Sequence, residues 1–330
     1  VVLLLNKKIH LQPCQPPVWA RNGHQQTLVA HFLPSPPLPN DSQLVQMTLP
    51  DGDRLVARLF AKSSDKVISL FHGLGGSIQS DYIRRSVQIF SAQGYTVFAV
   101  NHRGQGEGLG LAKKPYHSGC SEDLSAALKY IRNIYPQAKH LAFGFSLGAN
   151  ALLHLLSRVQ DSTLVQPDFA VAVNPPVDLQ QAALLLKKGL NRIYDWRFVQ
   201  DCRQAIKYKI QSGLLHENIL LPIGTTLYDV DRIYTAPAIG LRSREEYYST
   251  CSTHKFLENI KTPTVILMSE DDPFIDFKAH VSAVKSDQVY LHLEKYGGHL
   301  GYLSKYKTPL GTYRWLDYAC STFAEKLLGY

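Results

Sequence analysis

Hydrophobic and polar positions follow two different periods along most of this chain. Residues 44–49 and 54–60 alternate in polarity around a Pro-Asp-Gly turn, which predicts a β-hairpin. Short apolar runs without polar alternation predict buried strands at residues 67–71, 95–100, 140–145, 169–173, 264–268 and 289–293. Helical periodicity predicts helices at residues 82–93, 122–134 and 312–328. Buried strands that alternate with helices are typical of an α/β fold whose parallel sheet is covered on both faces.

The strand pattern stops between about residues 179 and 260, where the chain looks helical, and it then resumes. An insertion between strands of one sheet predicts a helical cap on a single domain, with residues 41–178 and 261–330 as its core. Residues 1–40 include a stretch rich in proline and polar groups, and we expect them to form an extended arm packed on the core.

Composition narrows the possible function classes. The chain has 330 residues, 45% of them hydrophobic and 19% charged, which indicates an ordered globular protein. Its formal net charge of +8 is spread along the chain without a basic stripe or a nucleic-acid motif. We therefore expect no nucleic-acid partner, whereas peripheral association with an anionic membrane is compatible with the charge. The sequence makes no prediction about oligomeric state.

Cysteine usage and hydropathy bear on the compartment. The five cysteines are odd in number and scattered, and they show no zinc-ligand spacing: Cys14, Cys120, Cys202, Cys251 and Cys320. We expect reduced thiols and a cytoplasmic protein without a bound metal. Residues 1–5 are apolar but too few for a signal core, and no apolar run reaches the eighteen residues that would suggest a membrane span.

The most informative stretch is Gly-x-Ser-x-Gly at residues 144–148, between a predicted strand and a helix-compatible segment. A serine at such a turn holds its hydroxyl clear of the sheet, and the flanking glycines avoid a collision with the turn itself. The N–H of Leu147 then points to the same space and is a candidate oxyanion donor. Ser146 is therefore the candidate nucleophile.

A serine nucleophile needs an imidazole base and an orienting carboxylate, which in this arrangement follow the serine in the order acid, then histidine. His299, between glycines after the last predicted strand, is the candidate base, whereas His292 and His154 are interpreted as structural. Asp272 is preferred as the acid over its neighbour Asp271, which we expect to cap or solvate the loop. The remaining acid candidates come further behind: Glu270 and Asp276.

Two further loops follow predicted strands. His72-Gly73-Leu74 is of the kind that supplies the second oxyanion donor, here the N–H of Leu74. The glycines of this loop and of residues 101–107 fit neither a phosphate-binding loop nor a dinucleotide fingerprint, and Arg103 is interpreted as structural. In the arm, the polar groups of residues 22–26 are interpreted as capping and anchoring groups.

Taken together, the elbow at residues 144–148, His72-Gly73, the loops at 101–106 and 271–274, and Gly298-His299 resemble the α/β-hydrolase superfamily. Three more specific segments are similar to the YheT-like esterases, the branch that contains the eukaryotic α/β-hydrolase domain proteins 1, 2 and 3. These segments are Asn-Gly-His-x-Gln-Thr at 22–27, Tyr-His-Ser-Gly at 116–119 and Tyr-Tyr-x-x-Cys-Ser at 247–252.

This resemblance implies an eight-stranded, mostly parallel sheet with an antiparallel second strand, a helical cap, and hydrolysis of short- to medium-chain acyl esters. By position it implies a triad of Ser146, Asp272 and His299 and no cofactor. Two alternatives remain open: acyl transfer or phospholipase activity through the same acyl-enzyme, and a hydrolase fold that only binds. A carboxylate nucleophile, as in dehalogenases, does not match the serine at the elbow.

Overall fold

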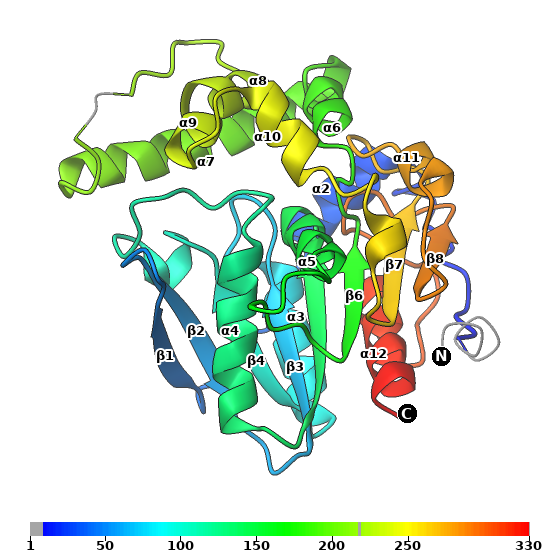
Figure 1. Cartoon of the computed structure of the whole chain (residues 1–330). Helices are drawn as coiled ribbons and strands as arrows, with labels where there is room; N and C mark the ends of the chain where they lie inside the picture. The colour runs from blue at the N-terminus through cyan, green and yellow to red at the C-terminus, as the bar shows by residue number, and fades with distance from the viewer. Residues whose placement is uncertain (1–8, 217–218, 330) are drawn as a thin grey trace.

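One sheet forms the centre of the molecule (Figure 1). The structure, a computed structural model, describes residues 9–216 and 219–329, and within them eight strands lie in the order β1-β2-β4-β3-β5-β6-β7-β8. Strand β2 is antiparallel to β1 and β4, and all other neighbours are parallel, as expected. The strands are β1 Gln43–Thr48, β2 Arg54–Phe60, β3 Lys66–Phe71, β4 Thr96–Asn101, β5 Lys139–Phe145, β6 Phe169–Val173, β7 Thr264–Ser269 and β8 Val289–Glu294.

Every strand lies within one residue, at each end, of its predicted position, and the hairpin of β1 and β2 is confirmed. The agreement has a simple reason. Strands β4 and β7 are buried at all six positions and β3 at five of six, so nearly every side chain in them has to be apolar or small. Such runs stand out in a sequence.

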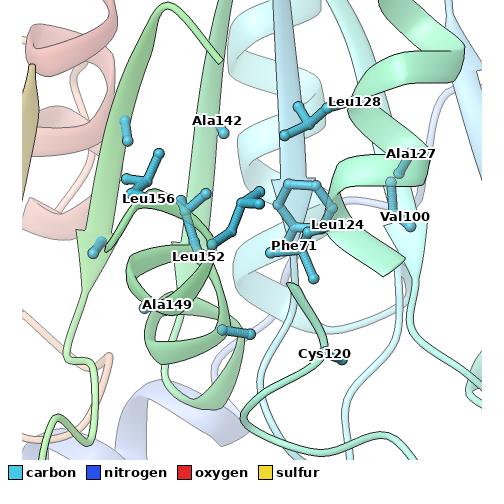
Figure 2. Packing of buried hydrophobic residues seen from close by; sticks show 14 of the residues in the cluster. Phe71, Val100, Cys120, Leu124, Ala127, Leu128, Ala142, Ala149, Leu152 and Leu156 are labelled. Atoms are coloured by element: carbon cyan, nitrogen blue, oxygen red, sulfur yellow. The ribbon is translucent and has the colours of Figure 1, made fainter. Parts of the chain in front are cut away.

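Helices cover both faces of the sheet. Helices α3 (Asp81–Ala92) and α12 (Trp315–Leu328) pack on one face, and α4 (Ser121–Ile134) and α5 (Leu147–Ser157) pack on the other. Figure 2 shows the second of these layers, where side chains of α4 and α5 meet Phe71, Val100 and Ala142 of the sheet. The sheet therefore has a hydrophobic core on each side, and its carboxyl edge is left for the loops.

A group of helices between β6 and β7 lies over the carboxyl edge of the sheet (Figure 1). We call residues 179–260 the cap. Its longest helix, α7, crosses the whole width of this group (Figure 1). The elements of the cap are α6 Leu179–Leu186, η2 Gly189–Asn191, α7 Arg192–Gln211, α8 Leu227–Val230, the π-helix η3 Asp231–Thr235, α9 Ala236–Ala238, α10 Arg244–Cys251 and η4 Leu257–Asn259. Two short elements lie outside it: η1 Gly106–Gly108 and α11 Lys278–Ser282.

The prediction of an extended arm is wrong for its middle part, which forms helix α2 (Gly23–Phe32). The helix begins with a capping box, in which Asn22 Oδ1 accepts from Gln25 N at 3.0 Å and Gln25 Oε1 accepts from Asn22 N at 3.4 Å. Gln26 is buried and anchors the helix, because its Oε1 accepts from Leu303 N at 2.6 Å. The polar groups thus cap and anchor the arm as interpreted, while residues 1–8 of the predicted arm lie outside the described residues.

The last helix begins three residues later than predicted, at Trp315. Arg314 pairs with Leu303 in an isolated β-bridge and donates to the carbonyl of Ala30 at 2.9 Å, so its backbone and side chain are held outside the helix. Across residues 9–216 and 219–329, no helix has the length and apolar character needed to span a bilayer.

Candidate active site

Ser146 lies at the turn between β5 and α5 with φ 53° and ψ −122°, a backbone conformation that is strained for a residue with a side chain. The flanking glycines are required by close contacts. A Cβ at Gly144 would lie 2.6 Å from Ala149 Cα, and one at Gly148 would collide with the carbonyl oxygen of His72. The predicted elbow therefore has the geometry that its spacing indicates.

His299 and Asp272 meet Ser146 in a hydrogen-bonded line. His299 Nε2 lies 2.8 Å from Ser146 Oγ, and His299 Nδ1 lies 2.8 Å from Asp272 Oδ2. The Asp272 side chain is fully buried, and that of His299 is 9% exposed. The three residues come from loops after β5, β7 and β8, so the carboxyl edge of the sheet brings them together.

The two neighbouring aspartates, Asp271 and Asp272, form hydrogen bonds with different groups. Asp272 Oδ1 accepts from the N–H groups of Phe274 and Ile275, each at 3.1 Å, which leaves Oδ2 facing His299. Asp271 Oδ1 instead accepts from Gly298 N at 2.8 Å, and burial raises the pKa of Asp271. Asp271 therefore holds the loop of the histidine, while Asp272 contacts the imidazole.

Asn174 is a site residue that the sequence reasoning missed. It follows β6 with φ 46°, and its Nδ2 donates to Asp272 Oδ2 at 2.7 Å. Tyr302 OH donates to Asn174 Oδ1 at 2.7 Å and so fixes the orientation of the amide. Both side chains are fully buried. Only the position of Asn174 directly after a buried strand could have indicated it, because that is where sites form in such sheets.

The arm also builds the site. His299 N donates to Thr27 Oγ1 at 2.8 Å, and a Cβ at Gly23 would collide with the carbonyl oxygen of Asp271. His24 Nδ1 lies 3.1 Å from Tyr194 OH of α7, with the two rings stacked. Helix α2 therefore contacts the loops of the acid and the base and also the cap.

The candidate oxyanion donors lie beside the serine. A Cβ at Gly73 would be 2.9 Å from Ser146 Cβ, so the loop after β3 passes directly over the hydroxyl. Leu74, Leu147 and Ser146 line one pocket. Within the described ranges, the N–H groups of Leu74 and Leu147 donate no hydrogen bond to the protein. Both remain available to a ligand, and their function stays a prediction.

Buried histidines support this loop. His72 Nε2 accepts from His102 N at 3.1 Å, and His102 stacks on Tyr116 with ring centroids 3.9 Å apart. Burial lowers the pKa of His72 to about 4 and that of His102 well below its ordinary value. Both imidazoles are therefore neutral near pH 7, and they add no positive charge behind the serine.

We expect the neutral buried histidines to make the protein less stable in acid. Burial lowers the pKa of His72, His117 and His280 from 6.5 to about 4. Between pH 6.5 and 4 these groups bind protons in the unfolded chain only, so the free energy of unfolding falls as pH falls. Each contributes up to about 1.4 kcal/mol per pH unit. Asp231 opposes this in part, because burial raises its pKa to about 6.

Urea unfolding at pH 7.5 and pH 5.0 tests this expectation. The midpoint should be lower at pH 5.0, and the His280→Asn variant should lose less stability between the two pH values than the parent. His280 is a suitable position because it is a buried residue of α11 whose Nε2 lies 2.9 Å from the carbonyl oxygen of Pro175. An equal loss in parent and variant would show that His280 does not contribute.

Arg103 forms a buried ion cluster, as its structural interpretation predicts. It bonds to Asp123 at 2.7 Å, Asp53 at 2.6 Å and Asp51 at 2.8 Å, and these carboxylates raise its pKa. The cluster fixes the loop after β4. His154 is also structural, since it bonds to Ser121 Oγ at 2.7 Å.

A pocket lined by Ser146 is also lined by residues of the cap. Its apolar wall near the serine comes mostly from α6 and from the loop after β7: Leu179, Ala182, Ala183, Leu186, Phe274 and Ile275. The lining also includes Lys209 of α7, whose Nζ donates to the carbonyls of Lys113 and Lys114 at 2.8 and 2.9 Å. Burial lowers the pKa of Lys209 to about 8.

All five cysteines are free thiols. In the described part of the chain, no three His, Cys, Asp or Glu side chains are arranged to hold a metal ion.

Comparisons with known proteins agree with this geometry. Residues 66–306 match the family model described as the alpha/beta hydrolase fold. The chain is 30% identical to YheT of Escherichia coli, provisionally described as an esterase, over 82% of this chain and 81% of YheT. It is 27% identical to the phospholipase ABHD3 of Mus musculus, over 87% of this chain and 72% of that protein. The Pyrococcus furiosus esterase Pf2001 has a similar structure, with a TM-score of 0.55, 19% identity and coverage of 90% and 99%.

Proposed function

The chain belongs to the α/β-hydrolase family and is a hydrolase of the esterase and lipase kind, and from that membership we propose that it cleaves esters of short- to medium-chain carboxylic acids. The observation that carries the proposal is the line from Ser146 Oγ through the imidazole of His299 to Asp272, with 2.8 Å at both contacts. Ser146 lines a largely apolar pocket.

In the proposed reaction, Ser146 Oγ attacks the acyl carbonyl while His299 Nε2 takes the hydroxyl proton. The N–H groups of Leu74 and Leu147 stabilise the oxyanion, and Asp272 stabilises the imidazolium through Nδ1. Collapse of the tetrahedral intermediate breaks the ester C–O bond, and His299 gives its proton to the leaving alcohol. Water then attacks the acyl-enzyme with His299 as base, which releases the acid and restores the serine. Protein groups and water supply every step, so the proposal needs no cofactor.

The names of two relatives favour lipid esters as substrates. ABHD3 of Mus musculus is described as a phospholipase, and ABHD2 of Danio rerio, 25% identical over 94% of this chain, as a monoacylglycerol lipase. Both reactions start with the same acyl-enzyme. Phospholipase and monoacylglycerol lipase activity differ in the alcohol portion of the substrate. The apolar wall formed by α6 fits the acyl portion of both kinds of substrate.

A series of p-nitrophenyl esters from acetate to hexadecanoate, with fluorophosphonate labelling, tests the proposal. We expect one label per chain and the highest kcat/KM between acetate and decanoate, the short- to medium-chain range of the proposal. Adding an alcohol acceptor distinguishes hydrolysis from acyl transfer by the products formed. A protein that neither labels nor turns over any ester would contradict the enzymatic proposal and favour a binding protein.

A further inference from the structure

The turn between α6 and α7, together with the start of α7, exposes large apolar side chains to solvent. We call residues 187–197 the cap corner. Leu190 is 64% exposed, Ile193 54% and Trp196 61%. The cap corner lies between Leu186 and Phe198, which both line the pocket, so it flanks the pocket directly in the chain. Exposed apolar side chains gathered in one short segment indicate a surface that contacts something.

The charges of the cap corner are all of one sign at the surface. Four basic side chains of the segment are exposed: Lys187, Lys188, Arg192 and Arg197. Arg197 also forms an ion pair with Asp201, at 3.3 Å. The only acidic residue of the segment, Asp195, is buried and accepts from Leu227 N at 2.8 Å. The cap corner therefore carries four exposed cations and three exposed apolar side chains, and it contains no exposed acid.

Burial and hydrogen bonds hold the cap corner in place. In α7 the side chains of Tyr194 and Asp195 point inward and are buried, whereas Ile193, Trp196 and Arg197 occupy the opposite, exposed face. Asn191 Nδ2 donates to the carbonyl of Leu185 at 3.1 Å and to that of Pro273 at 2.6 Å. The cap corner is thus tied to the loop that carries Asp272.

We propose that the cap corner docks on the surface of an anionic lipid bilayer. Leu190, Ile193 and Trp196 enter the interface, and the cations contact the lipid headgroups, in the manner of interfacial helices with an apolar face and a basic surround. The net charge of +8 adds long-range attraction. Docking places the pocket next to the membrane, where lipophilic esters are concentrated. This last step rests on the proposed function, but the docking itself does not.

Vesicle sedimentation tests the docking without any enzymatic readout. The Ser146→Ala protein is mixed with vesicles of phosphatidylcholine alone, or of phosphatidylcholine with about 30% phosphatidylglycerol. We expect binding to the anionic vesicles only, and weaker binding in 0.5 M salt. Adding Lys187→Gln, Lys188→Gln and Arg192→Gln should weaken binding roughly 100-fold, at about 1 kcal/mol for each charge. Adding Ile193→Ser and Trp196→Ser should weaken it at least about tenfold.

Control variants remove the same number of cations and the same number of exposed apolar side chains elsewhere on the surface. Lys261→Gln, Lys305→Gln and Lys307→Gln remove three exposed charges, and Val281→Ser and Val284→Ser alter side chains that are 54% and 67% exposed. We expect the valine pair to bind like the parent. The triple lysine variant should also bind more weakly than the parent. Its change in log Kd should be less than a third of the change shown by the triple variant of the cap corner.

Fluorescence locates the contact. Anionic vesicles should shift the emission of Trp196 to the blue, and a Trp196→Phe variant should lose this shift while it still binds. A Trp19→Phe variant, altered at the other exposed tryptophan, should keep it.

Three results would overturn the docking proposal: equal binding to both kinds of vesicle, unchanged binding of the cap-corner variants, or a dimer of the parent that the Ile193→Ser/Trp196→Ser variant converts to a monomer. The last result would mean that a second copy of the chain covers the surface.

Hydrolysis of p-nitrophenyl butyrate in solution should be unchanged in the Ile193→Ser/Trp196→Ser form of the active protein. A parent that binds vesicles but hydrolyses no ester would contradict the proposed function alone.

Discussion

The Ser146→Ala substitution is expected to lower kcat for ester hydrolysis by about 10⁶-fold and to abolish fluorophosphonate labelling. The methyl group cannot attack a carbonyl, so the acyl-enzyme does not form. The fold should be unaffected, because alanine meets the same positive φ of 53° as serine and loses only the bond to His299. Steady-state kinetics with p-nitrophenyl butyrate and urea unfolding measure the two effects separately.

Ser157→Ala is the matched control for that experiment. Ser157 ends the same helix, α5, at the opposite end from the elbow, and its hydroxyl donates to the carbonyl of His154 at 2.9 Å. We expect it to retain parental activity and labelling. Full activity in Ser146→Ala would show that the nucleophile is misassigned, whatever the control does.

The Asp272→Asn substitution should lower kcat by about 10⁴-fold, the second largest effect that we expect. An amide N–H that donates to His299 Nδ1 favours the tautomer whose single ring proton is on Nε2, where the imidazole can no longer accept a proton from Ser146. The amide also lacks the charge that stabilises the imidazolium. The bonds from Phe274 and Ile275 to Oδ1 require only an oxygen and should hold the loop, whereas Asn174 Nδ2, which donates to Oδ2 at 2.7 Å, loses its acceptor when that atom becomes an amide nitrogen.

The Asp271→Asn substitution removes the charge of the neighbouring aspartate while it leaves the loop in shape. Its amide oxygen can still accept from Gly298 N, the bond that Asp271 makes at 2.8 Å, so we expect less than about a tenfold loss of kcat. A larger loss in Asp271→Asn than in Asp272→Asn would reverse the assignment of the acid. Circular dichroism of both variants identifies a loss that comes from misfolding.

Prediction from sequence worked best where burial constrains every position. The strands were located within one residue at each end because their side chains must be apolar on both faces, and the elbow was found because two glycines and a serine are required at fixed spacing. It failed at helix α2, whose face is only weakly apolar and which begins with a capping box of the less usual Asn–Gln type. At α2 the sequence signal for a helix was its N-terminal capping box, and the helical periodicity of apolar residues was weak.

The sequence by itself therefore determined the α/β fold, the elbow at Ser146 and the candidates His299 and Asp272, since each depends on residue types within one short segment. Only the tertiary structure decided which side chains meet. Asn174 contacts Asp272 because β6 lies next to β7, and Thr27 contacts His299 because α2 packs on the loop after β8. The exposure of Ile193 and Trp196 likewise depends on which face of α7 the rest of the cap covers. Such pairings join residues about a hundred or more positions apart, and no local pattern encodes them.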